Sequence, residues 1–214
     1  MKYKAIIFDM DGTILNTLDD LKDSLNVVLK KNQYPLRSME EVRSFVGNGI
    51  QKLIERAVPE GISQDDLNRV YMEFKAYYQE HCAIKTKPYD GILELLKELK
   101  EKGYLTAVVS NKADDAVQDL CKEYFPGLFH CALGEKEEIR KKPAPDSVFA
   151  TLKELKVEAK DAVYIGDSEV DFATAQNAKL DHIIVRWGFR DEDFLRKQGA
   201  TVFVSQPEEI LKLI

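Results

Sequence analysis

The sequence is poor in the residues that carry several common kinds of catalysis. It holds three histidines and three cysteines in 214 residues. The cysteines, Cys82, Cys121 and Cys131, form neither a CxxC motif nor a Cys/His spacing typical of zinc sites, so we expect buried, reduced thiols. No histidine is placed to pair with a serine or cysteine nucleophile, which argues against proteolysis and acyl transfer.

Long apolar runs and an excess of positive charge are also missing. No run approaches the length needed to span a membrane. A net charge of −6 disfavours nucleic acid and anionic membrane surfaces as partners, because binding to a phosphate backbone needs a concentrated basic face. The first residues lead straight into a short strand pattern rather than a signal-type apolar segment, so we expect a cytoplasmic protein.

What is present is an ordinary globular composition with an α/β rhythm. Hydrophobic residues make up 44% and charged residues 32%. From residue 86 on, strand and helix patterns alternate, which predicts βαβ units and a parallel sheet. The expected strands cover residues 4–8, 105–109, 129–132, 162–165, 182–185 and 201–204. The expected helices cover 91–102, 114–124, 146–155, 169–178, a short segment after 185 and a terminal helix from 207.

The segment between the first strand and residue 86 has a different pattern. Helical periodicity covers residues 17–31, 39–45, 49–58 and 63–83, with no strand signal between them. Such a block indicates a helical layer inserted into another fold. The sequence thus predicts an α/β protein: a Rossmann-like parallel sheet core with helices on both faces, from residues 1–15 and 86–214, and an inserted all-helical cap domain, residues 16–85.

The first strand ends abruptly in charge. The apolar residues 5–8 are followed by Asp9, Asp11, Gly12 and Thr13. Two like charges at the end of a buried strand repel each other and lose hydration, so we expect a cation between them. A divalent metal suits this place, because hard cations bind carboxylate and carbonyl oxygens and Gly12 permits a tight turn. A polar turn without any site is the plainer alternative for this stretch alone.

Polar side chains also follow the later strands. In an open parallel sheet, ligands bind beyond the carboxyl ends of the strands. The polar residues expected at that edge are Asp9, Asp11, Ser110, Asn111, Lys142, Asp167 and Asp171. Carboxylates, a lysine and a hydroxyl suit phosphoryl transfer, because its transition state is stabilised by a metal, a positive charge and hydrogen-bond donors around one phosphate.

These residues resemble the four ordered motifs of the haloacid dehalogenase superfamily of phosphatases. The motifs are Asp9-Met10-Asp11-Gly12-Thr13, Ser110-Asn111, Lys142-Pro143 and Gly166-Asp167-Ser168-Glu169-Val170-Asp171. Within the superfamily the chain is most similar to the phosphoglycolate phosphatase group, through Asp20-Leu21, Val46-Gly47-Asn48-Gly49, Leu53 with Arg56-Ala57, Pro88-Tyr89-Asp90-Gly91 and Trp187-Gly188. Four motifs in order, each at a strand end or helix start, make coincidence a poor explanation.

The resemblance implies a role for each carboxylate. Asp9 attacks phosphorus, becomes the aspartyl-phosphate and binds Mg²⁺ with its other oxygen, while Asp11 protonates the leaving alcohol and then deprotonates the attacking water. The backbone carbonyl of Asp11 and the side chain of Asp167 are further ligands of Mg²⁺. Asp171 orients the site or binds the metal through water. The alternatives are a purely structural Asp9 and a helix N-cap at Asp167.

The resemblance also implies phosphate-binding residues. Ser110 and the amide of Asn111 hold phosphate oxygens, the alternative being a simple strand-end turn. Lys142 bridges the phosphate and Asp9, while Lys141 faces solvent. Thr13 either hydrogen-bonds near the phosphate or caps the following helix.

In the helical insert, Gly47-Asn48-Gly49 opens a helix. Free amides at a helix N-terminus can bind a carboxylate or phosphate, which would suit a small anionic substrate such as 2-phosphoglycolate. Arg56 lies on the same helix and either contributes to this binding or is a solvated charge.

Together these features predict a Mg²⁺-dependent phosphoric monoester hydrolase whose cap closes over a small phosphorylated metabolite, as a monomer or homodimer. The nearest alternative is a sugar-phosphate mutase of the same superfamily, similar to β-phosphoglucomutase, which would transfer the phosphoryl group back. A non-enzymatic phospho-receiver module ranks far lower, because receivers are about half this size and lack an inserted helical block.

Overall fold

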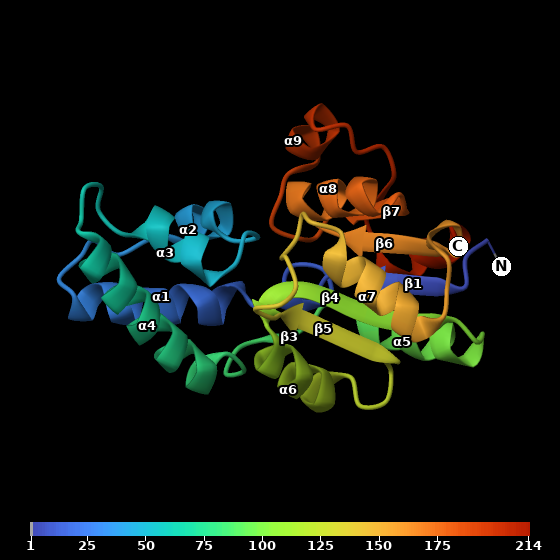
Figure 1. The fold of residues 1–214 in the computed structure, drawn as a ribbon, viewed down its shortest axis with the longest axis horizontal. Coiled ribbons are helices and arrows are strands. Elements are labelled where there is room, and N and C mark those ends of the chain that lie inside the picture. The colour runs from blue at the N-terminus through green and yellow to red at the C-terminus, as the bar shows by residue number, and fades with distance from the viewer. Residues whose placement is uncertain (1) are drawn as a thin grey trace. The chain divides into compact units, whose positions relative to one another are not determined.

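The computed structural model describes residues 2–214, and its elements are drawn in Figure 1. The chain divides into two compact units, one formed by the residues up to Leu15 together with Pro88–Ile214, and the other by Asn16–Lys87. Two short strands, β2 (Leu15–Asn16) and β3 (Lys87–Pro88), pair where the chain passes between the units. No strand is predicted at β2, because two residues are too few to give a periodic signal.

The larger unit is built on a six-stranded parallel sheet. Its strand order is β5-β4-β1-β6-β7-β8, with bounds β1 (Ala5–Phe8), β4 (Leu105–Ala113), β5 (Cys131–Glu135), β6 (Ala162–Gly166), β7 (Asp181–Val185) and β8 (Phe203–Val204). Helices α5 (Ile92–Glu101) and α6 (Asp114–Tyr124) lie on one face, and α7 (Asp146–Leu155) and α8 (Glu169–Ala178) lie on the other (Figure 1). The predicted α/β fold class, with a parallel sheet and helices on both faces, is confirmed.

Strand β1 is central to this sheet and apolar throughout. Ala5, Ile6, Ile7 and Phe8 are fully buried, because β4 and β6 pair with β1 on its two sides and helices cover both faces. Burial of a large apolar side chain contributes about 1.5–3 kcal/mol to the stability of the fold. The apolar side chains of β1 therefore strongly favour its position at the centre of the sheet. The carboxyl end of β1 therefore lies between those of β4 and β6.

The predicted boundaries of three strands in the larger unit are wrong, and one of them, β8, begins at Phe203 instead of Thr201. Strand β4 continues to Ala113 instead of ending at Val109, with a register shift against β5 between these residues. Strand β5 is displaced toward the C-terminus, covering Cys131–Glu135. The terminal segment Pro207–Lys212 (η2) is a 3₁₀-helix, as is Ala159–Asp161 (η1), whereas α9 (Glu192–Lys197) is the expected short α-helix.

The smaller unit is helical. It consists of α1 (Leu18–Lys31), α2 (Met39–Phe45), α3 (Ile50–Ala57) and α4 (Gln64–His81). Phe74 and Tyr78 of α4 are buried and stack with their ring centroids 5.4 Å apart, so these two aromatic residues belong to the core of this unit. Within residues 2–214, no helix combines the length and the apolar character that a membrane crossing requires. That this unit acts as a cap stays a prediction.

Candidate active site

Three neighbouring strands bring the predicted residues to one edge of the sheet. Asp9 directly follows β1, Ser110 lies in β4, and Asp167 directly follows β6. The Asp9 N–H donates to the carbonyl of Ile165 at 2.8 Å, which continues the pairing of β1 with β6 past the end of the strand. Because the strands are parallel, all these residues lie at the carboxyl edge, where open α/β sheets bind ligands.

A buried cluster of opposite charges lies at this edge. The Nζ of Lys142 is 2.7 Å from Oδ1 of Asp9 and 2.8 Å from Oδ1 of Asp171. It also donates to the hydroxyl of Tyr164 at 3.0 Å, and that hydroxyl donates to the carbonyl of Val109 at 3.1 Å. The lysine side chain is 2% exposed. Lys142 therefore lies beside Asp9, as the resemblance implies, and is tied to both β6 and β4.

Burial and charge act in opposite directions on these groups. Burial raises the pKa of Asp9 to about 7, with Asp171 adding to the rise and Lys142 opposing it. Burial alone would lower the pKa of Lys142, but Asp171 and Asp9 outweigh it and raise the pKa of that lysine well above its usual range. The lysine is therefore charged at neutral pH, while Asp9 stands close to its midpoint.

Asp171 is held by the start of helix α8. Its Oδ2 accepts hydrogen bonds from the Ser168 hydroxyl at 2.6 Å, the Ser168 N–H at 3.0 Å and the Asp167 N–H at 3.2 Å. Ser168 is the N-cap of α8, so the alternative that Asp167 caps this helix is wrong. Asp171 therefore binds Lys142 through Oδ1 and the start of α8 through Oδ2, which fits a role in orienting the site.

Asp167 is fixed by the loop after β7. Its Oδ2 accepts from the Phe189 N–H at 2.6 Å, and its Oδ1 accepts from the Thr13 hydroxyl at 3.3 Å. A Cβ at Gly188 would lie 2.2 Å from the Cβ of Asp167, so a glycine is required for the loop to approach this closely. Helix α1 has Thr17 as its N-cap, so the alternative that Thr13 caps it is wrong.

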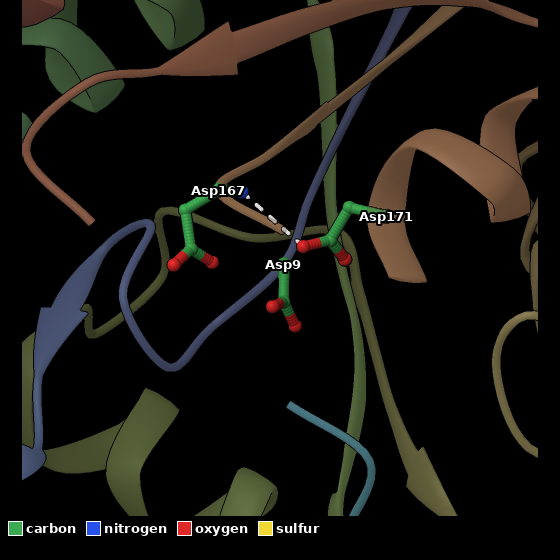
Figure 2. Close-up of side chains that lie close together, drawn as sticks. All are labelled: Asp9, Asp167 and Asp171. Atoms are coloured by element: carbon green, nitrogen blue, oxygen red, sulfur yellow. Dashed lines mark hydrogen bonds between the residues drawn. The ribbon is translucent and has the colours of Figure 1, made fainter. Parts of the chain in front are cut away.

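The carboxylates Asp9, Asp167 and Asp171 form a group that fits a metal ion. They are buried, and each offers an oxygen within 4.8 Å of the others. Figure 2 shows the three side chains close together. Burial raises the pKa of Asp167 well above its usual range, with Asp171 and Asp9 adding to the rise. One lysine cannot balance three carboxylates, and a hard divalent cation bound by their oxygens would do so.

Asp11 has a lysine partner that is not among the residues predicted from the sequence. The Nζ of Lys112 lies 2.9 Å from Oδ1 and 3.2 Å from Oδ2 of Asp11. The lysine side chain is 4% exposed, against 23% for Asp11. The sequence does contain a signal for this position of Lys112. It follows Ser110 by two residues, and in a strand such residues lie on the same face. The predicted strand ends at Val109, so this alternation is not extended to Ser110 and Lys112.

Asn111 and Ser110 lie within β4, so the alternative of a strand-end turn is wrong. The Asn111 side chain accepts from the Lys142 N–H at 2.9 Å and donates to the Lys142 carbonyl at 3.1 Å. Ser110 is 5% exposed, and its hydroxyl oxygen accepts from the Lys112 N–H at 3.2 Å. Asn111 thus fixes the backbone of Lys142, a function that the sequence analysis did not assign to it.

Gly47, Asn48 and Gly49 belong to the smaller unit and precede α3. The φ angles of 107° at Gly47 and 84° at Gly49 favour glycine. Arg56 donates from Nη2 to Oδ1 of Asn48 at 2.9 Å and from Nη1 to the carbonyl of Phe45 at 2.6 Å. Arg56 therefore supports this turn structurally. Binding of substrate by the three residues stays a prediction.

The three cysteines are free thiols, but the expectation of burial holds fully for Cys131 alone, since Cys82 and Cys121 are partly exposed. Burial raises the pKa of Cys121 and of Cys131 to about 12, with Glu154 adding to the rise at Cys131. Both thiols are therefore protonated at neutral pH and unsuited to nucleophilic catalysis.

Binding of Mg²⁺ should stabilise the protein more at about pH 8 than at about pH 6, because protons compete for Asp9, whose pKa is about 7. At 100 times its Kd the ion would add about 2.7 kcal/mol to the free energy of unfolding. Thermal unfolding with EDTA and with Mg²⁺ at both pH values measures this. Asp167→Asn should reduce the shift at pH 8, and an equal shift at both pH values would contradict the prediction.

The chain is similar to known hydrolases over its whole length. A sequence model of haloacid dehalogenase-like hydrolases matches residues 6–185. The N-acetylmuramic acid 6-phosphate phosphatase of Pseudomonas aeruginosa is 29% identical, covering 100% of this chain and 96% of the relative. The phosphoglycolate phosphatase of Aquifex aeolicus is 29% identical, covering 99% and 96%. The crystal structure of a candidate phosphoglycolate phosphatase from Lactobacillus delbrueckii subsp. bulgaricus is 45% identical, with a TM-score of 0.96 and coverage of 100% and 99%.

Proposed function

This chain belongs to the haloacid dehalogenase-like hydrolase family, and on that premise we propose that it hydrolyses a small phosphate monoester through an aspartyl-phosphate at Asp9, with Mg²⁺ as its cofactor. The observation that carries the proposal is the buried 2.7 Å contact between Lys142 Nζ and Asp9 Oδ1 beside two further buried carboxylates. A fixed positive charge there reduces the repulsion between the nucleophile and an anionic phosphate.

The first half-reaction transfers the phosphoryl group to the protein. A carboxylate oxygen of Asp9 forms a bond to phosphorus while the bond between phosphorus and the ester oxygen breaks. Asp11 donates its proton to that oxygen, so the leaving group departs as an alcohol. The Ser110 hydroxyl and the Asn111 N–H hold the phosphate oxygens, and Lys142 offsets their charge.

The second half-reaction releases phosphate. Asp11, now a carboxylate, takes a proton from water as the water oxygen bonds to phosphorus and the bond to Asp9 breaks. Inorganic phosphate leaves, and both aspartates return to their starting states. Asp9, the Asp11 carbonyl and Asp167 would hold Mg²⁺, which supplies positive charge to the transferring phosphoryl group.

We propose a phosphoglycolate-like substrate. Support comes from the relative in Aquifex aeolicus, which is named a phosphoglycolate phosphatase. The glycine-rich turn before α3 is the proposed contact for a second anionic group, since a helix N-terminus favours an anion. The relative named for N-acetylmuramic acid 6-phosphate is equally identical, at 29%. Both names describe phosphate monoesters, so the chemistry at Asp9 is common to them, and the leaving group distinguishes them.

The proposal is tested by phosphate release from 2-phosphoglycolate, N-acetylmuramic acid 6-phosphate and glucose 6-phosphate, with Mg²⁺ or EDTA. We expect Mg²⁺-dependent turnover, with kcat/KM for 2-phosphoglycolate more than about tenfold above the others. A preference for N-acetylmuramic acid 6-phosphate would refute the proposed substrate but would still support the proposed phosphatase activity. Conversion of β-glucose 1-phosphate into its 6-phosphate isomer without phosphate release would instead support a mutase, and stoichiometric phosphorylation without turnover would support a receiver.

A further inference from the structure

We infer that Lys112 is a positioning residue, which holds the carboxyl group of Asp11 in place for proton transfer to the leaving group. The inference rests on the proposed function. It comes from the contact between the two side chains, in which Lys112 Nζ reaches both oxygens of Asp11, at 2.9 Å and 3.2 Å. When Asp11 is protonated, one oxygen accepts from Lys112 while the other carries the proton that is transferred.

The two partners differ in how firmly the fold holds them. Lys112 lies inside β4, a nine-residue strand of the central sheet, and its side chain is 4% exposed. Asp11 lies in the irregular segment after β1, two residues beyond Asp9, and its side chain is 23% exposed. The lysine is therefore the fixed partner, and the aspartate is the partner that gains a fixed orientation.

Asp11 also differs from the other acidic residues of the site. Asp9, Asp167 and Asp171 converge within 4.8 Å, and Lys142 contacts two of them. The Asp11 carboxyl group is outside this convergence and has its own lysine. The site thus contains two ion-pair systems, one around the nucleophile and one around the acid and base.

Orientation matters because proton donation to an ester oxygen needs a donor within hydrogen-bond reach. A displacement of about 1 Å can lower a rate by about 10²-fold. The effect depends on the leaving group. An alkyl alcohol such as glycolate leaves slowly without a proton, whereas p-nitrophenolate is stable as an anion and hardly needs one.

The test is the variant Lys112→Met, which keeps most of the apolar stem and removes the ammonium. We expect kcat for 2-phosphoglycolate to fall on the order of tenfold to a hundredfold, and kcat for p-nitrophenyl phosphate to fall less than about threefold. The matched control is Lys136→Met, which removes a lysine from a more exposed ion pair with Asp114 at 3.1 Å. It should leave both rates unchanged. Equal losses on both substrates in Lys112→Met would overturn the inference.

A double-mutant cycle shows whether Lys112 acts through Asp11. In an Asp11→Asn background, Lys112→Met should cause no further loss with 2-phosphoglycolate, measured in single turnovers. A further loss as large as in the wild type would mean that Lys112 acts on the substrate directly. If Lys112→Met fails to fold, Lys112→Gln replaces it, because its shorter side chain lacks the ammonium group, and the loss should again be larger for 2-phosphoglycolate than for p-nitrophenyl phosphate. Failure of the proposed function has a separate signature, since the wild-type protein would then release no phosphate from either ester.

Discussion

Replacing Asp9 by asparagine should abolish turnover and leave the fold intact. An amide cannot form the aspartyl-phosphate, so kcat should fall by at least about 10⁴-fold. Burial raises the pKa of Asp9 from 3.8 to about 7, so ionised Asp9 weakens the fold, and its contribution to the free energy of unfolding falls as pH rises from about 4 to about 7. At about pH 8 in EDTA, the neutral asparagine should therefore unfold at the same temperature as the wild type or higher.

Phosphate release and thermal unfolding on the same samples measure both parts of this prediction. Asp146→Asn is the matched control, because Asp146 is a carboxylate in an exposed pair with Arg140, and its replacement should leave turnover unchanged. If the turnover of Asp9→Asn is within about tenfold of the wild type, the proposal that Asp9 is the nucleophile is refuted. Loss of activity together with a lower unfolding temperature at pH 8 would instead indicate a structural role for Asp9.

The centre of the fold and of the site could be predicted because the relevant signals are local. Strand β1 is buried on both faces, so it is an uninterrupted apolar run, and the change to Asp9 marks its end. Ser168 and Asp171 cap a helix within four residues of each other, so their contact also follows from a short stretch of sequence.

The missed features depend on contacts between distant segments. Tyr164 looks like an ordinary core residue of β6, and its hydroxyl meets Lys142 only when the chain folds across 22 positions. Lys112 meets Asp11 across 101 positions. The same contacts explain the error at the end of β4. Ser110 and Lys112 lie within the strand although they are polar, and in sequence alone polar residues after an apolar run predict the end of a strand.

In the smaller unit, too, the helices could be predicted from the sequence and a side-chain contact could not. Its helices follow from the helical periodicity of the sequence. The contact of Arg56 with Asn48 cannot be predicted in this way. A charged residue on a helix surface has many available partners, and the sequence does not indicate which of them it contacts. Under the proposed function, substrate preference would depend on side chains of this kind, so the sequence predicts the reaction better than the leaving group.

Replacing Lys142 by methionine should both abolish turnover and destabilise the protein strongly. Removal of one partner from a buried ion pair leaves an unpaired charge, at a cost of about 3–5 kcal/mol. Here two carboxylates, Asp9 and Asp171, with side chains 11% and 1% exposed, would lose their shared cation. For a chain of this size each 1 kcal/mol lowers Tm by about 2–4 °C. Thermal unfolding in EDTA at about pH 8 measures the loss, which should shrink at lower pH as Asp9 becomes protonated.

The charge-based cause can be separated from lost packing by a second substitution. Lys142→Met combined with Asp171→Asn removes one of the two stranded carboxylates, so it should recover part of the lost Tm while remaining inactive. Lys141→Met is the control, because its half-exposed ammonium is 3.7 Å from Glu135 and should matter by less than about 0.5 kcal/mol. If the double variant is less stable than Lys142→Met alone, then Asp171 stabilises α8 more through its bonds to Ser168 than its charge costs, and stranded charge is not the cause. If Lys142→Met keeps its catalytic rate, phosphate approaches Asp9 without this lysine, and the central contact of the proposed mechanism is dispensable.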